Sequence, residues 1–174
     1  MRTLLTFLAL ALYCPAVFSG ETLPLVTPGG TKLVVSKMER EEGIFAEFSG
    51  RIWVSGTLVA QWLRGVDEEA DNTLDIRLLP DAASIKMLPY FESYPVKQID
   101  LENETEVLKM AVESSVMTKL LHKEIKIVKA EGKFLLGNYI VGVDCNAPWA
   151  RARVVKAKIP KPLNLTGTPD QVGC

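Results

Sequence analysis

Apolar and polar residues alternate along several stretches of the chain, which is the pattern of half-buried β-strands. The longest such stretch runs from Phe48 to Trp62, with Ile52 and Val54 on the apolar parity and polar residues between them. A single strand is usually about 3–10 residues long. Gly50 and Gly56 are therefore predicted to bend or interrupt this run.

Further strands are predicted on both sides of this run. Residues 32–38, 73–79 and 96–101 each form a short β-rich segment. Residues 124–159 are predicted to form a three-strand meander, with Glu131-Gly132 as its first turn and Asn146-Ala147-Pro148 as its second.

One helix is predicted over about 103–122. Asn103 followed by Glu106 matches a capping box, and His122 suits the negative end of the helix dipole. The apolar residues of this segment fall on two faces rather than one. Such a helix is either well covered or broken near Ser114-Ser115.

Strands, then a helix, then more strands is the layout of an α+β domain with mainly antiparallel pairing. The prediction is a β-rich single domain over residues 20–174. Its mostly antiparallel sheet is either open or a partly closed barrel, with one packed helix at about 103–122.

The first 19 residues are typical of a secretory signal peptide. Arg2 precedes the apolar run Leu4–Leu12, and Val17 and Ser19 occupy the small-residue positions before a cleavage site. We expect cleavage after Ser19 and a secreted or periplasmic protein. A lipid anchor on Cys14 is a minor alternative. No later stretch reaches the roughly 20 apolar residues of a membrane-spanning helix, so no transmembrane span is predicted.

Charge and composition exclude several function classes. Arg2 is the only charge before Gly20, so the remainder holds 21 acidic residues and all but one of the 20 basic ones, a net charge of −2. A dedicated nucleic-acid binder carries a strong basic excess. A single histidine, His122, is too few for a multi-histidine metal site. No metal, cofactor or nucleic acid is predicted.

Two cysteines remain after cleavage, Cys145 and Cys174. In an oxidising compartment such a pair indicates a disulfide, worth about 3–4 kcal/mol for a loop of this length. The alternative is Cys145 as a nucleophile beside His122. The disulfide is favoured because nothing in the sequence places His122 near Cys145.

Two groups of residues are candidates for binding. Aromatic residues in the irregular segment between two prolines are a candidate ligand site, although such residues more often belong to the core. Basic residues near the C-terminal end of the meander are a candidate surface for a partner or an anion, although charge also guards edge strands. The ligand group is Tyr90, Phe91 and Tyr94, and the basic group is Arg151, Arg153, Lys156 and Lys158.

Two further features have a structural and a functional interpretation. The acidic segment 67–71 is a solvated loop or, without the ligand spacing of an EF-hand, a calcium-binding loop. Asn103 and Asn164 each begin a glycosylation sequon, which matters if the host glycosylates.

The catalytic inventory is thin, which favours a secreted or periplasmic non-enzymatic binding module. Its partner would be a protein or a cell-envelope ligand, and a hydrolase inhibitor or an envelope accessory protein is a conceivable subtype. The first alternative is an envelope hydrolase that uses carboxylates or His122. The second is a structural envelope component that self-associates through exposed strands.

Overall fold

The computed structural model describes residues 23–40, 43–63 and 73–160. The predicted leader, the acidic segment 67–71, Asn164 and Cys174 lie outside these residues. In chain order the elements are β1 (Leu25–Val26), β2 (Val34–Glu39), β3 (Ile44–Ser49), β4 (Ile52–Leu63), β5 (Thr73–Pro80), α1 (Ala82–Ile85), β6 (Tyr90–Phe91), β7 (Ile99–Leu101), α2 (Glu104–Ala111), α3 (Ser114–Leu121), β8 (Ile127–Asp144) and β9 (Ala147–Lys158).

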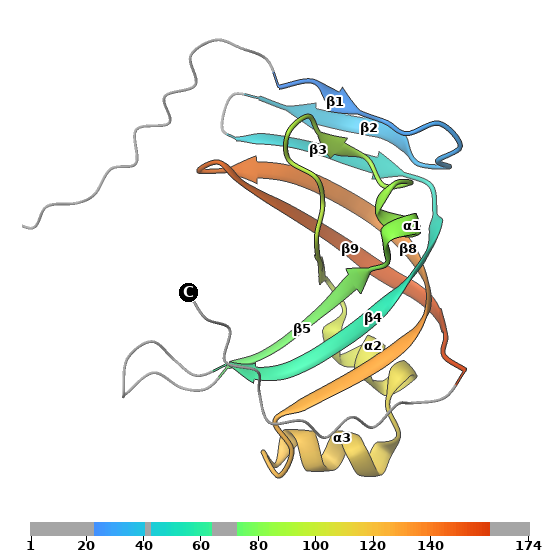
Figure 1. The fold of residues 1–174 in the computed structure, drawn as a ribbon, viewed down its shortest axis with the longest axis vertical. Helices are drawn as coiled ribbons and strands as arrows, with labels where there is room; N and C mark the ends of the chain where they lie inside the picture. Colours follow the sequence, from blue (N-terminus) through green and yellow to red (C-terminus); the bar gives the residue numbers. More distant parts are fainter. Residues whose placement is uncertain (1–22, 41–42, 64–72, 161–174) are drawn as a thin grey trace, which may run out of the picture.

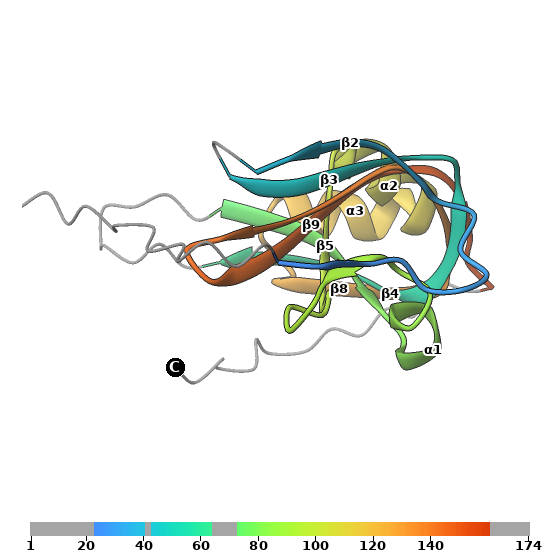
Figure 2. The ribbon, with the colours of Figure 1, turned by 90° about the horizontal axis from the view of Figure 1, so that it is seen from above.

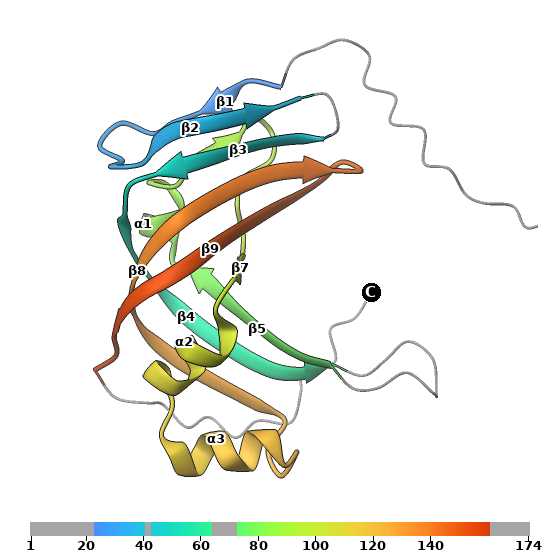
Figure 3. The same ribbon diagram turned by 180° about the vertical axis from the view of Figure 1, so that it is seen from behind.

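Five strands close into a barrel (Figures 1 and 3). Around the barrel the order is β4, β5, β7, β9 and β8, and β8 pairs with β4 to complete the circle. Only the β7–β9 pair is parallel. The fourth barrel strand, β8, returns beside the first, β4, which is a Greek-key arrangement. The prediction of a β-rich α+β domain with antiparallel pairing is confirmed.

The long strand β8 organises the rest of the sheet. β3 and β4 follow one another along the same edge of β8, while β9 occupies the other edge. Between β3 and β4 the chain bends at Gly50, whose φ of 99° is favourable only for glycine. β2 then extends the sheet beyond β3, on the side of the molecule opposite β4 and α1 (Figure 2).

The apolar parity of the strands fills the barrel. Val54 and Leu58 of β4 and Phe134 and Leu136 of β8 are all buried. This parity matches the alternation in the sequence, because successive side chains of a strand point to opposite faces.

Helices α2 and α3 lie together at one end of the barrel (Figure 1). Leu120 of α3 is fully buried, and the indole N–H of Trp62 donates to the Leu120 carbonyl at 2.7 Å.

Tyr139 of β8 is buried against Phe48, with ring centroids 5.7 Å apart. Burial raises the pKa of Tyr139, and its hydroxyl donates to the carbonyl of Pro89 at 3.0 Å.

Of the two alternatives for the helix predicted over about 103–122, the break near Ser114-Ser115 is confirmed, because the segment forms two helices. Val112 ends α2 in an extended conformation, and α3 begins two residues later at Ser114. The predicted capping box is wrong: Asn103 occupies the N-cap position of α2, but its side chain does not cap the helix. The Asn103 side chain instead bonds both backbone groups of Val154 in β9.

The turn predicted at Glu131-Gly132 is also wrong, because β8 runs through it without interruption. Gly132 lies opposite Gly56 of β4. A Cβ at Gly132 would lie 2.8 Å from the carbonyl oxygen of Lys158, so glycine here allows the close approach of β9 rather than a turn.

Candidate functional site

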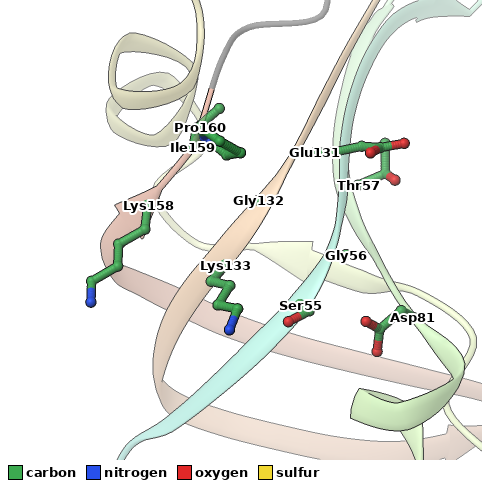
Figure 4. A pocket seen from close by; sticks show the side chains of 10 residues that line it. All are labelled: Ser55, Gly56, Thr57, Asp81, Glu131, Gly132, Lys133, Lys158, Ile159 and Pro160. Atoms are coloured by element: carbon green, nitrogen blue, oxygen red, sulfur yellow. The ribbon is translucent and has the colours of Figure 1, made fainter.

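A pocket of about 720 Å³ lies where β4, β8 and the end of β9 meet. Its lining includes the paired glycines Gly56 and Gly132, so we call it the glycine-pair pocket. The flanking positions of both strands present polar or charged side chains. The lining residues are Ser55, Gly56, Thr57, Asp81, Glu131, Gly132, Lys133, Lys158, Ile159 and Pro160 (Figure 4).

Two lysines form one side of the pocket. Lys133 of β8 and Lys158 of β9 are directly opposite in the antiparallel register. Within the described part of the chain neither ammonium has a carboxylate within 4.0 Å. The Lys158 ammonium lies 5.0 Å from the ring centroid of Trp53, whose side chain is 37% exposed. Like charges that face each other across strands are unfavourable, so this pair is suited to an anion that neutralises both.

Carboxylates form the other side of the pocket. Figure 4 shows Asp81 and Glu131 away from the two lysine side chains. Asp81 caps α1, and its Oδ1 accepts the Ser84 N–H at 2.7 Å. This hydrogen bond from the Ser84 backbone is the main cause that lowers the pKa of Asp81, so the group is ionised at neutral pH. The pocket therefore offers charges of both signs to a ligand.

The predicted basic surface is divided by its partners. Arg153 Nη2 lies 3.0 Å from Glu106 Oε2, and Arg151 is opposite Asp100 in the β7–β9 register. Lys156 and Lys158, in contrast, form no ion pair among the described residues. Two of the four residues therefore lie beside carboxylates and two do not.

Sequence analysis did not include Lys133 as a site residue. The signal was present, because Lys133 lies on the polar parity of the run that becomes β8. The predicted turn at Glu131-Gly132 concealed it, because that turn would end the strand before Lys133. Its position opposite Lys158 depends on the β8–β9 register, which no local pattern specifies.

The predicted aromatic site lies partly in the core. Phe91 is fully buried in β6, where it pairs with Leu25 of β1. Tyr90 and Tyr94 are half-buried and pack against the core. The Tyr94 hydroxyl lies 3.5 Å from Asn146 Oδ1 at the β8–β9 turn. In this conformation Tyr90 and Tyr94, but not Phe91, have surface that a ligand can touch.

A second cavity, of about 570 Å³, lies over β5, β7 and the start of α2. We call it the acidic cavity, because Asp75, Asp100 and Glu104 line it together with Arg151. The pKa of Asp100 is raised mainly by its partial burial and, to a smaller extent, by the negative charge of Asp75. The same two causes, in the same order, raise the pKa of Glu104. The Arg77 Nε lies 3.4 Å from Asp75 Oδ2, and neither atom has a hydrogen bond.

The residues of the predicted cysteine–histidine alternative are both exposed. His122 is the C-cap residue of α3, at the negative end of the helix dipole as predicted. Cys145 lies in the two-residue β8–β9 turn with φ of 45°. Its predicted disulfide partner, Cys174, lies outside the described residues.

Comparisons with known proteins do not assign a family. No family model, no curated protein and no solved structure matches this chain. Across the described ranges, no group of three or more histidine, cysteine or acidic side chains is placed to hold a metal ion. None of the described helices has the length and apolar character to cross a membrane. A Greek-key barrel serves many functions, so any function has to be inferred from the chemistry of the site.

Proposed function

We propose that this protein is a non-enzymatic binding module that acts after export and holds an anionic cell-envelope ligand in the glycine-pair pocket. The observation that carries the proposal is the facing pair Lys133 and Lys158, which has no carboxylate within 4.0 Å among the described residues. The pocket volume, about 720 Å³, lies within the range of small-molecule sites.

The lining supports an acidic saccharide as the ligand class. A carboxylate or phosphate group would bridge the ammoniums of Lys133 and Lys158. The partly exposed indole of Trp53, beside Lys158, offers an apolar face to a sugar ring. Sugar hydroxyls would donate to the carboxylates of Asp81 and Glu131 on the opposite side.

Binding of defined saccharides tests this proposal. We expect oligogalacturonate, as an acidic probe, to bind in isothermal titration calorimetry and to weaken as salt is added. The neutral oligosaccharide of the same length should bind more weakly. The variants Lys133→Ala and Lys158→Ala should each lose about tenfold to 150-fold in affinity, because a hydrogen bond to a charged group contributes about 1.5–3 kcal/mol.

The matched control is Lys97→Ala, which removes an exposed lysine that does not line the pocket. It should retain wild-type affinity. The pocket is not the ligand site if Lys133→Ala and Lys158→Ala bind the acidic probe as tightly as the control. The ligand class is wrong if the acidic and neutral saccharides bind alike.

The acidic cavity favours a second candidate function, a hydrolase that uses carboxylates. The pKa values of Asp100 and Glu104 are both raised, which is the direction that favours a general acid. This candidate predicts turnover of chromogenic glycosides or esters that Asp100→Asn and Glu104→Gln abolish and His122→Ala leaves unchanged. Turnover that survives both carboxylate substitutions would remove these residues from the reaction.

Export and the disulfide belong to the same proposal. The Arg2 and Leu4–Leu12 pattern supports cleavage after Ser19, and the exposure of Cys145 at a turn leaves it accessible to a second thiol. The mature protein should have a mass that begins at Gly20. After unfolding without a reductant it should titrate no free thiol. Two titratable thiols would contradict the bridge between Cys145 and Cys174.

A further inference from the structure

A third cavity, of about 340 Å³, lies between the bend at Gly50, the paired strands β8 and β9, and helix α2. It shares no lining residue with the glycine-pair pocket or the acidic cavity. Small-molecule sites span about 300–1,000 Å³. The third cavity is at the lower end of this range, so it suits a smaller ligand than the glycine-pair pocket does.

Two β-bulges accompany the third cavity. The β8–β9 register shifts on both sides of the pair Gly137–Arg153. One shift inserts Val155 as an extra residue of β9, and the other follows Gly137, where Asn138 has a φ of 50°. All four residues line the cavity. Bulges bend a strand and redirect its side chains, and they are frequent beside functional sites.

Two arginines reach the third cavity from opposite edges of β8. Arg153 of β9 pairs with Gly137, and Arg51 lies directly before β4, with its Cγ 3.8 Å from where a Cβ at Gly137 would be. Among the described residues Arg51 has no carboxylate within 4.0 Å. Guanidinium groups bind carboxylates through paired hydrogen bonds, so these arginines are suited to a carboxylate ligand.

One carboxylate, that of Glu106 in α2, lines the same cavity. Its Oε2 accepts hydrogen bonds from Arg153 Nη2 and from Asn103 Nδ2, each at 3.0 Å. In the described part of the chain no group donates to Oε1. The Arg153 and Glu106 side chains remain 47% and 60% exposed, so a ligand can reach both. Glu106 is therefore held through one oxygen and can offer the other to a cation.

Two apolar side chains line the cavity beside these charges. Met110 of α2 is 45% exposed and Val155 of β9 is 41% exposed. Covering them with an apolar group would remove their surface from water, which is favourable. The lining therefore combines two positive charges, one negative charge and an apolar contact.

We propose that the third cavity binds an α-amino acid with an apolar side chain. The carboxylate of the ligand would bind Arg51 and Arg153, and its ammonium would donate to Glu106 Oε1. Its side chain would cover Met110 and Val155. A simple anion would face the like charge of Glu106, and a simple amine would face the like charges of the arginines. A zwitterion satisfies all three charged groups at once.

Three ligands that share one apolar skeleton test the proposal. They are leucine, 4-methylpentanoate, which lacks the ammonium of leucine, and 3-methylbutylamine, which lacks its carboxylate. In isothermal titration calorimetry leucine should bind about tenfold or more tightly than either analogue, because each analogue loses a charged hydrogen-bonding group. Arg51→Ala should weaken leucine by about tenfold or more for the same reason. The matched control is Arg40→Ala, which removes an exposed arginine outside the cavity and should keep wild-type affinity.

Glu106→Gln separates recognition of the ammonium from support of the fold. It should weaken leucine by about tenfold or more and leave 4-methylpentanoate bound at least as tightly as in the wild type, since a repelling charge is removed. Near-UV circular dichroism checks that each variant is folded. The proposal is overturned if leucine does not bind the wild type at millimolar concentration or binds no more tightly than its analogues. It is also overturned if folded Arg51→Ala binds leucine like Arg40→Ala, or if Glu106→Gln affects leucine and 4-methylpentanoate equally.

Discussion

Replacing Asn103 with alanine should destabilise the protein more than any other single change to a polar residue at the start of α2. Asn103 follows β7, whose parallel pairing with β9 ends at Leu101 and Ala152. Its amide continues this pairing: Nδ2 donates to the carbonyl of Val154 at 2.9 Å, and Oδ1 accepts the Val154 N–H at 3.0 Å. Only 8% of Asn103 is exposed.

The magnitude follows from what the substitution leaves behind. In Asn103→Ala both backbone groups of Val154, a residue that is 1% exposed, lose their partners. Each unsatisfied buried group costs about 1–3 kcal/mol, so the loss of unfolding free energy for two groups should be about 2–6 kcal/mol. For a domain of this size each kcal/mol lowers Tm by about 2–4 °C.

The control separates these hydrogen bonds from the glycosylation sequon. Thr105→Ala removes the same sequon at an exposed position of α2 without touching the Asn103 contacts. Urea unfolding followed by circular dichroism should show a change within about 0.5 kcal/mol for this variant. Equal destabilisation by both substitutions, or an Asn103→Ala variant as stable as the wild type, would refute the reasoning. Because the Asn103 side-chain nitrogen and oxygen are both hydrogen-bonded to Val154, mass spectrometry should find no glycan on Asn103.

Three further predictions concern single side chains. Tyr139→Phe should cost about 1–3 kcal/mol in urea unfolding, because the Pro89 carbonyl loses the donor that now lies at 3.0 Å. Burial raises the pKa of Asp100, so the folded protein binds a proton at this carboxyl group more tightly than the unfolded chain does. The free energy of unfolding therefore falls as the pH rises above the pKa that Asp100 has in the unfolded chain. Asp100→Asn should therefore be more stable than the wild type at pH 7, with a difference that shrinks toward acid pH in a pH series of unfolding curves. Gly142→Ala should cost about 1–3 kcal/mol and shift the tryptophan fluorescence, because a Cβ there would overlap the indole of Trp149.

Each of these has an outcome that would contradict it. A Tyr139→Phe variant with wild-type stability would mean that the carbonyl finds another donor. A stability difference for Asp100→Asn that does not change with pH would separate its effect from protonation. For the glycine, Gly29→Ala is the control, since no atom lies within 4 Å of a Cβ at that position. Equal effects of the two alanines would argue against a clash with the indole.

Local patterns predicted much of the fold. Alternation identified β5 and most of β2 to within a residue or two, because a strand that is buried on one face needs an apolar side chain at every second position. The same logic predicted a bend at Gly50. It failed at Gly56, which lies inside the continuous strand β4, and at Gly132, because a glycine inside an alternating run has two meanings: a turn, or a close approach by another strand. At Gly132 the second meaning applies. The approaching strand, β9, begins 15 residues further along the chain.

The candidate site was predictable only in part, for the same reason. Lys158 was recognised as a binding candidate from its basic neighbours, whereas Lys133 became a site residue only through the register that places it opposite Lys158. Arg151 and Arg153 looked equivalent to Lys158 in sequence, but Asp100 and Glu106 from other elements lie beside them.

The spacing of apolar residues was enough to predict a strand-rich domain, because this spacing commits each segment to one kind of element and one buried face. Tertiary structure was needed to show that the strands close into a barrel, which of the described lysines lie beside a carboxylate, and which described strand forms the end of the sheet. Each of these depends on pairs of residues far apart in the chain. Their contact is set by strand register and closure, quantities that no short stretch of sequence contains.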